Sequence, residues 1–482
     1  MSSSTSLYEL QYSFIEELLM ERKIKQTNTY IEENKEKIMR SFKDFLMIPS
    51  ISATQDHKND IVNAANWVLE YLRDIGITDT SLLETDNHPM VFGSYNCGDE
   101  NKPTILIYGH YDVQPPDPLN LWESDPFNPT VRNNKIVARG AADMKGQIMV
   151  ILSAIEAIIR TNEVPVNLKF MIEGEEEIGS PNIESFLKKH KDKFACDFVL
   201  NLDAGTLSKN QPSIVYGLRG LAYFEIHITG PTHDLHSGLF GGVVLNPIHA
   251  LADLISGMID ERGVVQLPGF YEDVLSLSDE EKKKMAKLGL DEGYYKDQTG
   301  VNALFGEVNY TPTERIGARP TLDVNGIFGG FTGVGPKTVI PSKAMAKLST
   351  RLVPNQQPRK VYQQLLDYFS RNAPPQIEWE IKRLSGDSET PYVTNPDTPQ
   401  GKCFADALRK VWNVEPIYQR EGGSIPIASN IQNILGVSSI LSGFALPDDK
   451  IHSPNETMDL DMFWMGIETI IRYLYMAGEI CQ

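Results

Sequence analysis

Short apolar runs of strand length alternate with amphipathic segments in the N-terminal half of the chain, and this alternation limits the folds open to it. Three apolar runs, Thr104–Tyr108, Val166–Ile172 and Phe198–Leu202, predict buried strands. The segments between them, Gly146–Arg160 and Ile183–His190, carry apolar residues at helical spacing. Strands that alternate with helices of about 10 to 15 residues indicate βαβ units around a mainly parallel sheet.

The pattern changes near Tyr216 and returns to the first pattern in about the last hundred residues. Leu221–Ile228 alternates polar and apolar residues as an edge strand does, Pro247–Glu261 predicts a helix, and Leu275–Gly317 is polar and irregular. We therefore predict an α/β domain, with a mainly parallel mixed sheet flanked by helices, that is split by an inserted α+β domain. The predicted bounds are 1–40 for an N-terminal helical extension, 41–215 and 386–482 for the split domain, and 216–385 for the insertion.

The net charge argues against two classes of partner. Asp and Glu total 64 and Lys and Arg total 45, so the formal charge is −19. A surface this acidic repels phosphates, and we expect no nucleic-acid or membrane partner. No apolar run approaches the ~18 residues of a membrane-spanning helix, and we expect no signal peptide. The four cysteines lie far apart, as free thiols of a reducing compartment do, so we expect a cytoplasmic protein.

Polar side chains follow each of the three predicted strands. His110 and Asp112 come after the first strand, Glu176 and Glu177 after the second, and Asp203 after the third. Ligands of open α/β sheets bind at the carboxyl ends of the strands, so we expect these groups to converge. Clustered carboxylates need a cation to neutralise them, and oxygen ligands combined with imidazole suit zinc, manganese or cobalt.

Each of these features has a simpler explanation when it is taken alone. An acidic run such as residues 173–177 usually lies on a solvated helix face, but Gly174 and Gly179 bracket residues 175–178 here and place the acids in a loop. Two further candidates lie in loops, Asp143 before the helix at Gly146 and His452 before the last helix. Asp143 could equally be an ordinary aspartate at the start of a helix, and His452 could be an ordinary surface histidine.

Taken together, the motifs resemble those of the M20 family of metallopeptidases. The family motifs are His110-x-Asp112, Gly140-x-x-Asp143-x-x-Gly146, Glu176-Glu177-Ile178-Gly179-Ser180, Asp203 after a strand, and His452 near the end. Four further motifs resemble its dipeptidase branch, the cytosolic nonspecific dipeptidase and carnosinase group: Tyr216-Gly217-Leu218-Arg219-Gly220, Asp234-Leu235-His236-Ser237-Gly238, Thr350-Arg351-Leu352-Val353-Pro354-Asn355 and Arg420-Glu421-Gly422-Gly423-Ser424-Ile425-Pro426. The resemblance extends from about residue 40 to the C-terminus.

The resemblance implies two divalent cations, zinc, manganese or cobalt, held by five side chains. Asp143 would bridge the two cations. His110 and Asp203 would complete one cation site, and Glu177 and His452 would complete the other.

The resemblance also implies roles for residues around the cations. Glu176 would be the general base, and Asp112 would orient the His110 imidazole. The inserted domain would serve as lid and dimerisation domain, so that His236 reaches the active site of the other subunit of a homodimer and polarises the scissile carbonyl. Arg351 and the loop at Gly423 and Ser424 would bind the substrate's C-terminal carboxylate.

For two of these roles, a nearby residue of the same type is an alternative candidate. Glu175 precedes Glu176, and the position of Ile178-Gly179-Ser180 favours Glu176 as the base. His233 precedes His236, and the Ser-Gly pair that follows favours His236.

The expected activity is hydrolysis of dipeptides, or of short peptides with a free C-terminal carboxylate, by a metal-activated water. An N-acyl-amino-acid deacylase or desuccinylase of the same family is an alternative, because its substrate also has an amide beside a carboxylate. A catalytically inactive scaffold with the same fold is a third interpretation.

Overall fold

The computed structural model describes residues 7–386 and 389–479, and it divides into two compact units. Unit 1 lies within Met1–Val215, Asn395–Tyr418 and Asn430–Gln482, and unit 2 lies within Tyr216–Thr394 and Gln419–Ser429. Each unit has a hydrophobic core of its own.

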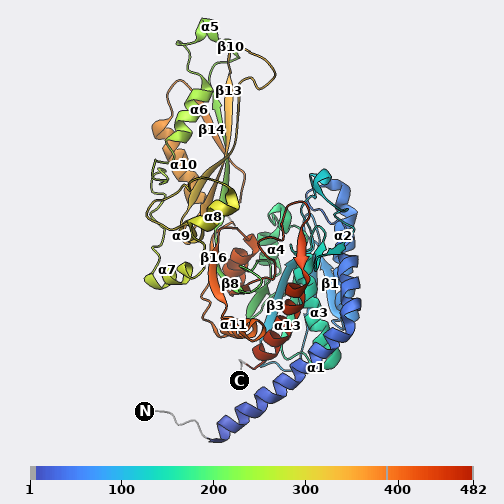
Figure 1. Ribbon diagram of the computed structural model, residues 1–482. Helices are drawn as coiled ribbons and strands as arrows, with labels where there is room; N and C mark the ends of the chain where they lie inside the picture. The colour runs from blue at the N-terminus through green and yellow to red at the C-terminus, as the bar shows by residue number, and fades with distance from the viewer. Residues whose placement is uncertain (1–6, 387–388, 480–482) are drawn as a thin grey trace. The chain divides into compact units, whose positions relative to one another are not determined.

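A mixed sheet forms the centre of unit 1, with the strand order β1-β2-β6-β3-β7-β17-β8. Its strands are β1 (Asp79–Leu83), β2 (Met90–Tyr95), β3 (Thr104–His110), β6 (Asn167–Glu173), β7 (Phe198–Asn201), β17 (Ser439–Leu441) and β8 (Ser213–Leu218). The four middle strands β6, β3, β7 and β17 run parallel, and the outer strands pair antiparallel. This parallel centre confirms the predicted βαβ pattern and the mixed α/β fold class (Figure 1).

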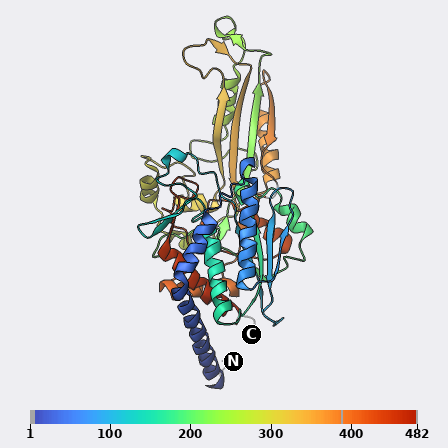
Figure 2. The same ribbon diagram turned by 90° about the vertical axis from the view of Figure 1, so that its right-hand side faces the viewer.

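Helices enclose this sheet because their apolar faces match its apolar strands. They are α1 (Leu7–Leu46), α2 (Lys58–Ile75), α3 (Lys145–Thr161), α4 (Ile183–Lys189), α11 (Pro399–Trp412) and α13 (Leu460–Ala477). Helix α3 packs on β3 and is buried over almost its whole length, and α1 lies beside α3 (Figure 2). The Asp459 side chain caps α13 by accepting hydrogen bonds from the backbone N–H groups of Asp461 and Met462.

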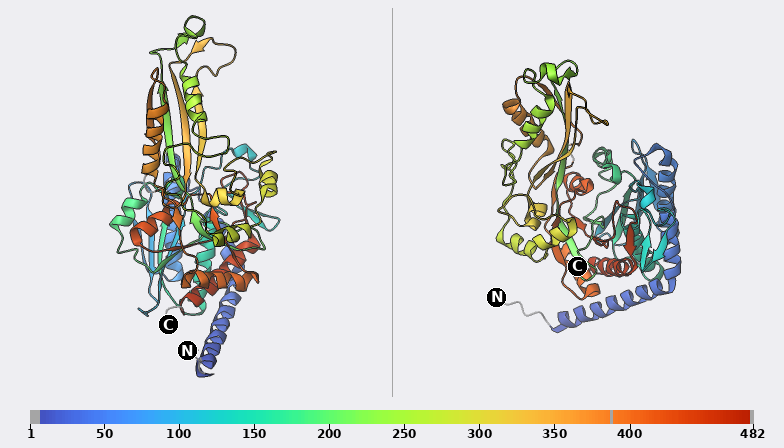
Figure 3. Two further views of the ribbon diagram at one scale, coloured as in Figure 1. Left: turned by 90° about the vertical axis from the view of Figure 1, so that its left-hand side faces the viewer. Right: turned by 45° about the horizontal axis from the view of Figure 1, so that its top comes forward.

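Unit 2 is built on a four-stranded antiparallel sheet with the order β11-β13-β9-β14. The strands are β9 (Gly220–Thr229), β11 (Thr321–Gly329), β13 (Lys343–Leu352) and β14 (Glu378–Arg383), and helices α6 (Pro247–Ser256) and α10 (Pro358–Asn372) pack on the sheet (Figure 3). Buried and half-buried residues alternate along β9. The edge position that we predicted for Leu221–Ile228 is therefore wrong: β9 is a central strand, and its alternation arises because one face of the sheet packs on helices.

Two further expectations for unit 2 need correction. The stretch Leu275–Gly317 was predicted to be irregular. It contains the short helices α7 (Asp279–Ala286) and α8 (Glu292–Thr299) and all but the last residue of α9 (Pro312–Ala318). Reciprocal side-chain caps, Ser278 with Glu281 and Thr311 with Glu314, stabilise the starts of α7 and α9, so local capping replaces the missing apolar stripe. Helix α6 ends at Ser256, earlier than the predicted Glu261.

Shorter elements complete the described chain. A three-stranded sheet in unit 1 contains β4 (Thr130–Arg132), β5 (Lys135–Val137) and β18 (Thr457–Asp459). In unit 2, β10 (Leu235–His236) pairs with β12 (Val339–Ile340) and leads into α5 (Ser237–Phe240), and β15 (Tyr392–Val393) pairs with the end of β8. The remaining elements are β16 (Ile417–Glu421), α12 (Pro426–Asn430), the π-helix Ile431–Leu435, and the 3-10 helices Gln55–His57, Leu119–Leu121 and Glu176–Ile178. Among the described residues, no helix is long and apolar enough to cross a membrane.

Candidate metal centre

The ends of three adjacent parallel strands carry several of the candidate ligands of unit 1. His110 is the last residue of β3, and its register partner in β6 is Glu173, which directly precedes the acidic loop. Tyr108 of β3 lies opposite Asn201, the last residue of β7, two residues before Asp203. The parallel sheet therefore brings polar groups from three separate chain segments to one edge.

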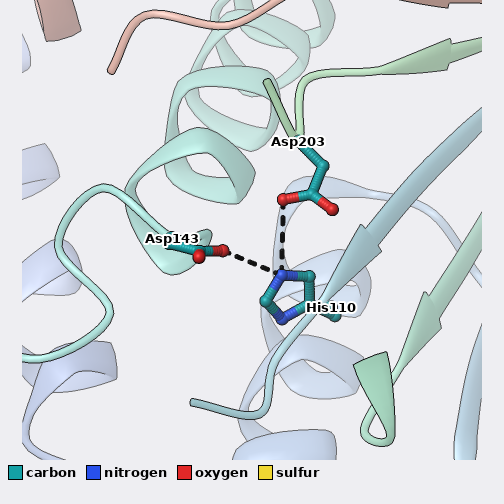
Figure 4. A group of neighbouring side chains, drawn as sticks. All are labelled: His110, Asp143 and Asp203. Carbon is teal, nitrogen blue, oxygen red and sulfur yellow. Dashed lines mark hydrogen bonds and ion pairs between the residues drawn. The ribbon is translucent and has the colours of Figure 1, made fainter. Parts of the chain in front are cut away.

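One group of candidate ligands consists of His110, Asp143 and Asp203. Nε2 of His110 lies 3.1 Å from Oδ1 of Asp143 and 3.5 Å from Oδ1 of Asp203. Figure 4 shows both carboxylates directed at the same imidazole nitrogen, one from the loop before α3 and the other from the turn after β7. One potential ligand atom of each residue lies within 4.8 Å of those of the other two.

A second group shares Asp143 with the first. The other oxygen of Asp143, Oδ2, lies 3.0 Å from Nε2 of His452, and the same nitrogen lies 3.1 Å from Oε2 of Glu177. The two oxygens of one carboxylate thus face two different histidines, which is the arrangement that a bridging ligand requires. His452 has a backbone φ of 61°, a value that is uncommon for residues other than glycine and occurs often at active sites.

The buried carboxylate of Glu456 holds the loop that carries Asp143. Its two oxygens accept hydrogen bonds from the backbone N–H groups of Gly140 (3.0 Å), Ala142 (2.9 Å) and Asp143 (3.1 Å). The Arg139 guanidinium donates a further hydrogen bond of 2.7 Å. Glu456 follows His452 by four residues, so one side chain connects the segments that supply two of the candidate ligands.

Asp112 and Gln114 hold the acidic loop in a similar way. The Asp112 carboxylate accepts hydrogen bonds from the backbone N–H groups of Glu176 (3.3 Å) and Glu177 (3.1 Å). Its backbone carbonyl lies 3.0 Å from Nδ1 of His110, and its carboxylate lies 3.5 Å from the same nitrogen. The Gln114 amide donates to Oε2 of Glu177 at 2.9 Å. A proton on Nδ1 leaves Nε2 of His110 as the ligating nitrogen.

The adjacent acids Glu175 and Glu176 have different surroundings. The Glu175 carboxylate is buried and accepts hydrogen bonds from the His88 backbone N–H (2.7 Å), the Thr85 hydroxyl (3.0 Å) and the Asn182 amide (2.9 Å). The Glu176 carboxylate forms no hydrogen bond or ion pair with any residue in 7–386 or 389–479. Burial, reinforced by the charge of Asp203, raises the pKa of Glu176 well above its usual range.

The charges of the two groups indicate a cation site. Burial raises the pKa of Asp203 to about 6. Hydrogen bonds to Asp143 and Glu177 raise the pKa of His452 to about 10. For His110, burial alone would lower the pKa, but Asp203 and hydrogen bonds to carboxylates raise it. Each ring attracts a proton because carboxylates surround it, and a divalent cation satisfies the same need when it displaces those protons, so the donor set fits metal ions.

The remaining predicted residues, Arg351, Gly423, Ser424 and His236, lie in unit 2. Nη1 of Arg351 donates a hydrogen bond of 2.8 Å to Oγ of Ser424, so β13 and the loop at residues 422–424 meet. His236 is exposed, and its Nδ1 accepts a hydrogen bond of 3.0 Å from the Gly238 backbone N–H, which leaves Nε2 as the donor nitrogen.

Glu456 and Gln114 were not predicted from the sequence as site residues. Most of the partners of Glu456 are backbone N–H groups, which leave no pattern in the sequence. Gln114 stands two residues after Asp112, as Asp112 does after His110, and this spacing was the available signal for it.

Three comparisons with known proteins place these observations in context. The family model of peptidase family M20/M25/M40 matches residues 106–476. The Cys-Gly metallodipeptidase DUG1 of Candida albicans is 32% identical over 475 residues, which cover 93% of this chain and 96% of that protein. The human Beta-Ala-His dipeptidase is 34% identical over 80% of this chain and 76% of its own length.

A solved structure agrees with these sequence relatives. The M20 family metallo-carboxypeptidase Sso-CP2 from Sulfolobus solfataricus superposes with a TM-score of 0.83 at 34% identity, and the match covers 92% of this chain and 99% of that one.

Proposed function

The chain belongs to peptidase family M20/M25/M40 and is a metallopeptidase, and from this premise we propose that it hydrolyses dipeptides with a free C-terminal carboxylate. One observation carries the proposal: the two oxygens of Asp143 face two histidines, His110 and His452, beside the carboxylate of Glu176, which has no hydrogen-bond or ion-pair partner among the described residues. A shared ligand next to a free carboxylate is suited to metal-assisted hydrolysis.

Five side chains would hold two divalent cations. Asp143 would bind both, with His110 and Asp203 on one side and Glu177 and His452 on the other. Two imidazoles and three carboxylates as ligands favour zinc or manganese, with cobalt as a third fit. When bound, two such cations lower the pKa of a water molecule and polarise the scissile carbonyl.

Glu176 is the general base of this proposal. Its carboxylate, which has no partner among the described residues, would take a proton from the attacking water and then pass it to the departing amine. Glu175 is unsuited to this task, because the His88, Thr85 and Asn182 groups occupy its oxygens. Asp112 would keep the base in place through its hydrogen bond with the Glu176 backbone N–H.

The groups of unit 2 would bind the substrate. Arg351, fixed by Ser424, would hold the C-terminal carboxylate together with the Gly423 backbone. His236 would donate a hydrogen bond from Nε2 to the carbonyl oxygen of the scissile amide and stabilise the charge that develops there.

We propose further that His236 acts in the active site of a partner subunit in a homodimer. Exposed apolar side chains flank His236 and occupy β11, namely Leu239, Val243, Ile327 and Phe328. In the described chain, β11 pairs with β13 alone, so one edge of this sheet is open. An open strand with exposed apolar side chains is typical of a subunit interface.

We also propose that the protein is cytoplasmic. Cys97, Cys196 and Cys403 are free thiols in the structure, and thiols that stay unpaired are typical of reducing compartments.

A substrate panel tests the proposed function. The metal-loaded protein is assayed with X-Gly, X-Ala and β-alanyl-His dipeptides, with the matching tripeptides, and with N-acetyl and N-succinyl amino acids, with added manganese or zinc. We expect turnover of the dipeptides to exceed that of the other two sets. Turnover of the acylated amino acids alone would replace the proposal with a deacylase, and preference for the tripeptides would replace it with a carboxypeptidase.

A further inference from the structure

Two arginines of unit 2 lie side by side, and neither has an acidic partner among the described residues. Arg219 directly precedes β9, where Gly220 pairs with Leu352 and Leu221 pairs with Arg351. Within residues 7–386 and 389–479, neither guanidinium forms an ion pair with a carboxylate. Two neighbouring guanidinium ions repel each other, and this repulsion is relieved when an anion binds to both.

Both arginines contact the same loop, residues 422–424. Nε of Arg219 donates a hydrogen bond of 3.0 Å to the Gly422 carbonyl, and its backbone N–H donates one of 3.1 Å to the Gly423 carbonyl. Nη1 of Arg351 donates to Ser424. A Cβ atom at Gly422 would lie 2.7 Å from Nη2 of Arg219, so the loop fits this guanidinium only because residue 422 is glycine.

The two guanidinium groups retain donors for a ligand. Each has five N–H donors, and the loop uses one of each guanidinium. The acidic neighbours act only through space: the charge of Asp323 raises the pKa of Arg219, and the charge of Arg351 lowers the pKa of Glu389 against the larger effect of burial. Burial, together with the charge of Arg351, lowers the pKa of Arg219 to about 10, as expected for a cation that lacks a counter-ion.

We propose that Arg219 is a positioning residue for the substrate's terminal carboxylate: it fixes the Gly422–Ser424 loop and supplies the second positive charge beside Arg351. The inference rests on the proposed dipeptidase function. It assigns to Arg219 the recognition of the free carboxylate, and it assigns no role in the hydrolytic step to this residue.

The test compares Arg219→Gln and Arg219→Lys with the matched control Arg315→Gln. Arg315 is half-buried and also donates from Nε to a backbone carbonyl, that of Glu307, at 2.9 Å, while its Nη1 donates to the Phe305 carbonyl at 3.3 Å. The metal-loaded variants are assayed with Ala-Gly and with the C-terminal amide of Ala-Gly, and their folding is checked by circular dichroism.

For Arg219→Gln we expect KM for Ala-Gly to rise about 10- to 100-fold, the range for loss of a charge-assisted contact, while kcat changes less than about threefold. Arg219→Lys should raise KM several-fold, because an ammonium group cannot hold the loop and face an anion at once. Arg315→Gln should leave KM within about twofold of the wild type. Any residual turnover of the amide should be insensitive to Arg219.

An unchanged KM in Arg219→Gln, or a fall in kcat at unchanged KM, would overturn the inference while the proposed function stands. If Arg219→Gln does not fold, a wild-type KM in Arg219→Lys overturns it in the same way. Failure of the wild-type enzyme to cleave any dipeptide would instead reject the proposed function itself.

Discussion

Glu175 and Glu176 are neighbours of the same chemical type, and their surroundings assign them different tasks. The Glu175 carboxylate accepts three hydrogen bonds, which connect the acidic loop to His88, Thr85 and Asn182. Glu176 has no such partner among the described residues and lies among the charges of Asp203, His110 and Glu177. At the residue scale, function therefore depends on which side chain the fold leaves free.

This contrast predicts opposite results for one substitution at adjacent positions. Glu176→Gln should lower kcat by about 10²- to 10⁴-fold, because the proton acceptor is lost, while metal content stays at the wild-type level. Glu175→Gln should lower stability but keep kcat of the folded enzyme within about tenfold. Steady-state kinetics together with metal analysis of both variants measures this. Ordinary activity in Glu176→Gln would show that another group is the base.

At the scale of elements, the loops matter as much as the strands. The parallel order of the sheet brings His110 and Asp203 together, but Asp143 and His452 come from loops outside its strands. Glu456 fixes one of them through hydrogen bonds to Gly140, Ala142 and Asp143 and an ion pair with Arg139.

Loss of this connection should weaken both folding and cation binding. Glu456→Gln leaves the buried Arg139 unpaired, and we expect the free energy of unfolding to fall by ~3–5 kcal/mol. Cation affinity should fall about 10- to 100-fold, as for other residues that orient metal ligands. Chemical denaturation and calorimetric titration with manganese measure the two effects.

Glu123→Gln is the matched control, because Glu123 forms an exposed ion pair with Arg132 and its loss should change stability by less than about 1 kcal/mol. Equal behaviour of the Glu456 and Glu123 variants would contradict the role of Glu456.

The observed helices and strands also show which features of the fold can be predicted from the sequence. Apolar periodicity predicted β3, β6 and α3 close to their observed bounds, because burial imposes that periodicity. It misplaced β9 at an edge, because alternation reports only one buried face, and it missed α7, α8 and α9, because short capped helices need no apolar stripe. At the site, spacing drew attention to the side chains at strand ends, whereas the backbone partners of Glu456 required the structure.

At the scale of the whole molecule, the proposal divides one active site between subunits. The cation ligands belong to unit 1, and His236 belongs to unit 2. Mixed dimers of a His236→Ala chain and a Glu176→Gln chain test this division. If His236 acts across the interface, one of the two sites of each mixed dimer is intact, and activity should return to about half of the wild-type value per dimer.

The two parent homodimers serve as controls, since each should be inactive but folded and metal-loaded. Mixed dimers as inactive as the parents would show that His236 acts within its own chain.

The central claim is that Asp143 joins two cations, and anomalous diffraction from crystals grown with manganese tests it most directly. We predict two anomalous peaks per chain that share Asp143 as a ligand, one beside His110 and Asp203 and the other beside Glu177 and His452. A single peak, or no peak in contact with Asp143, would contradict the account.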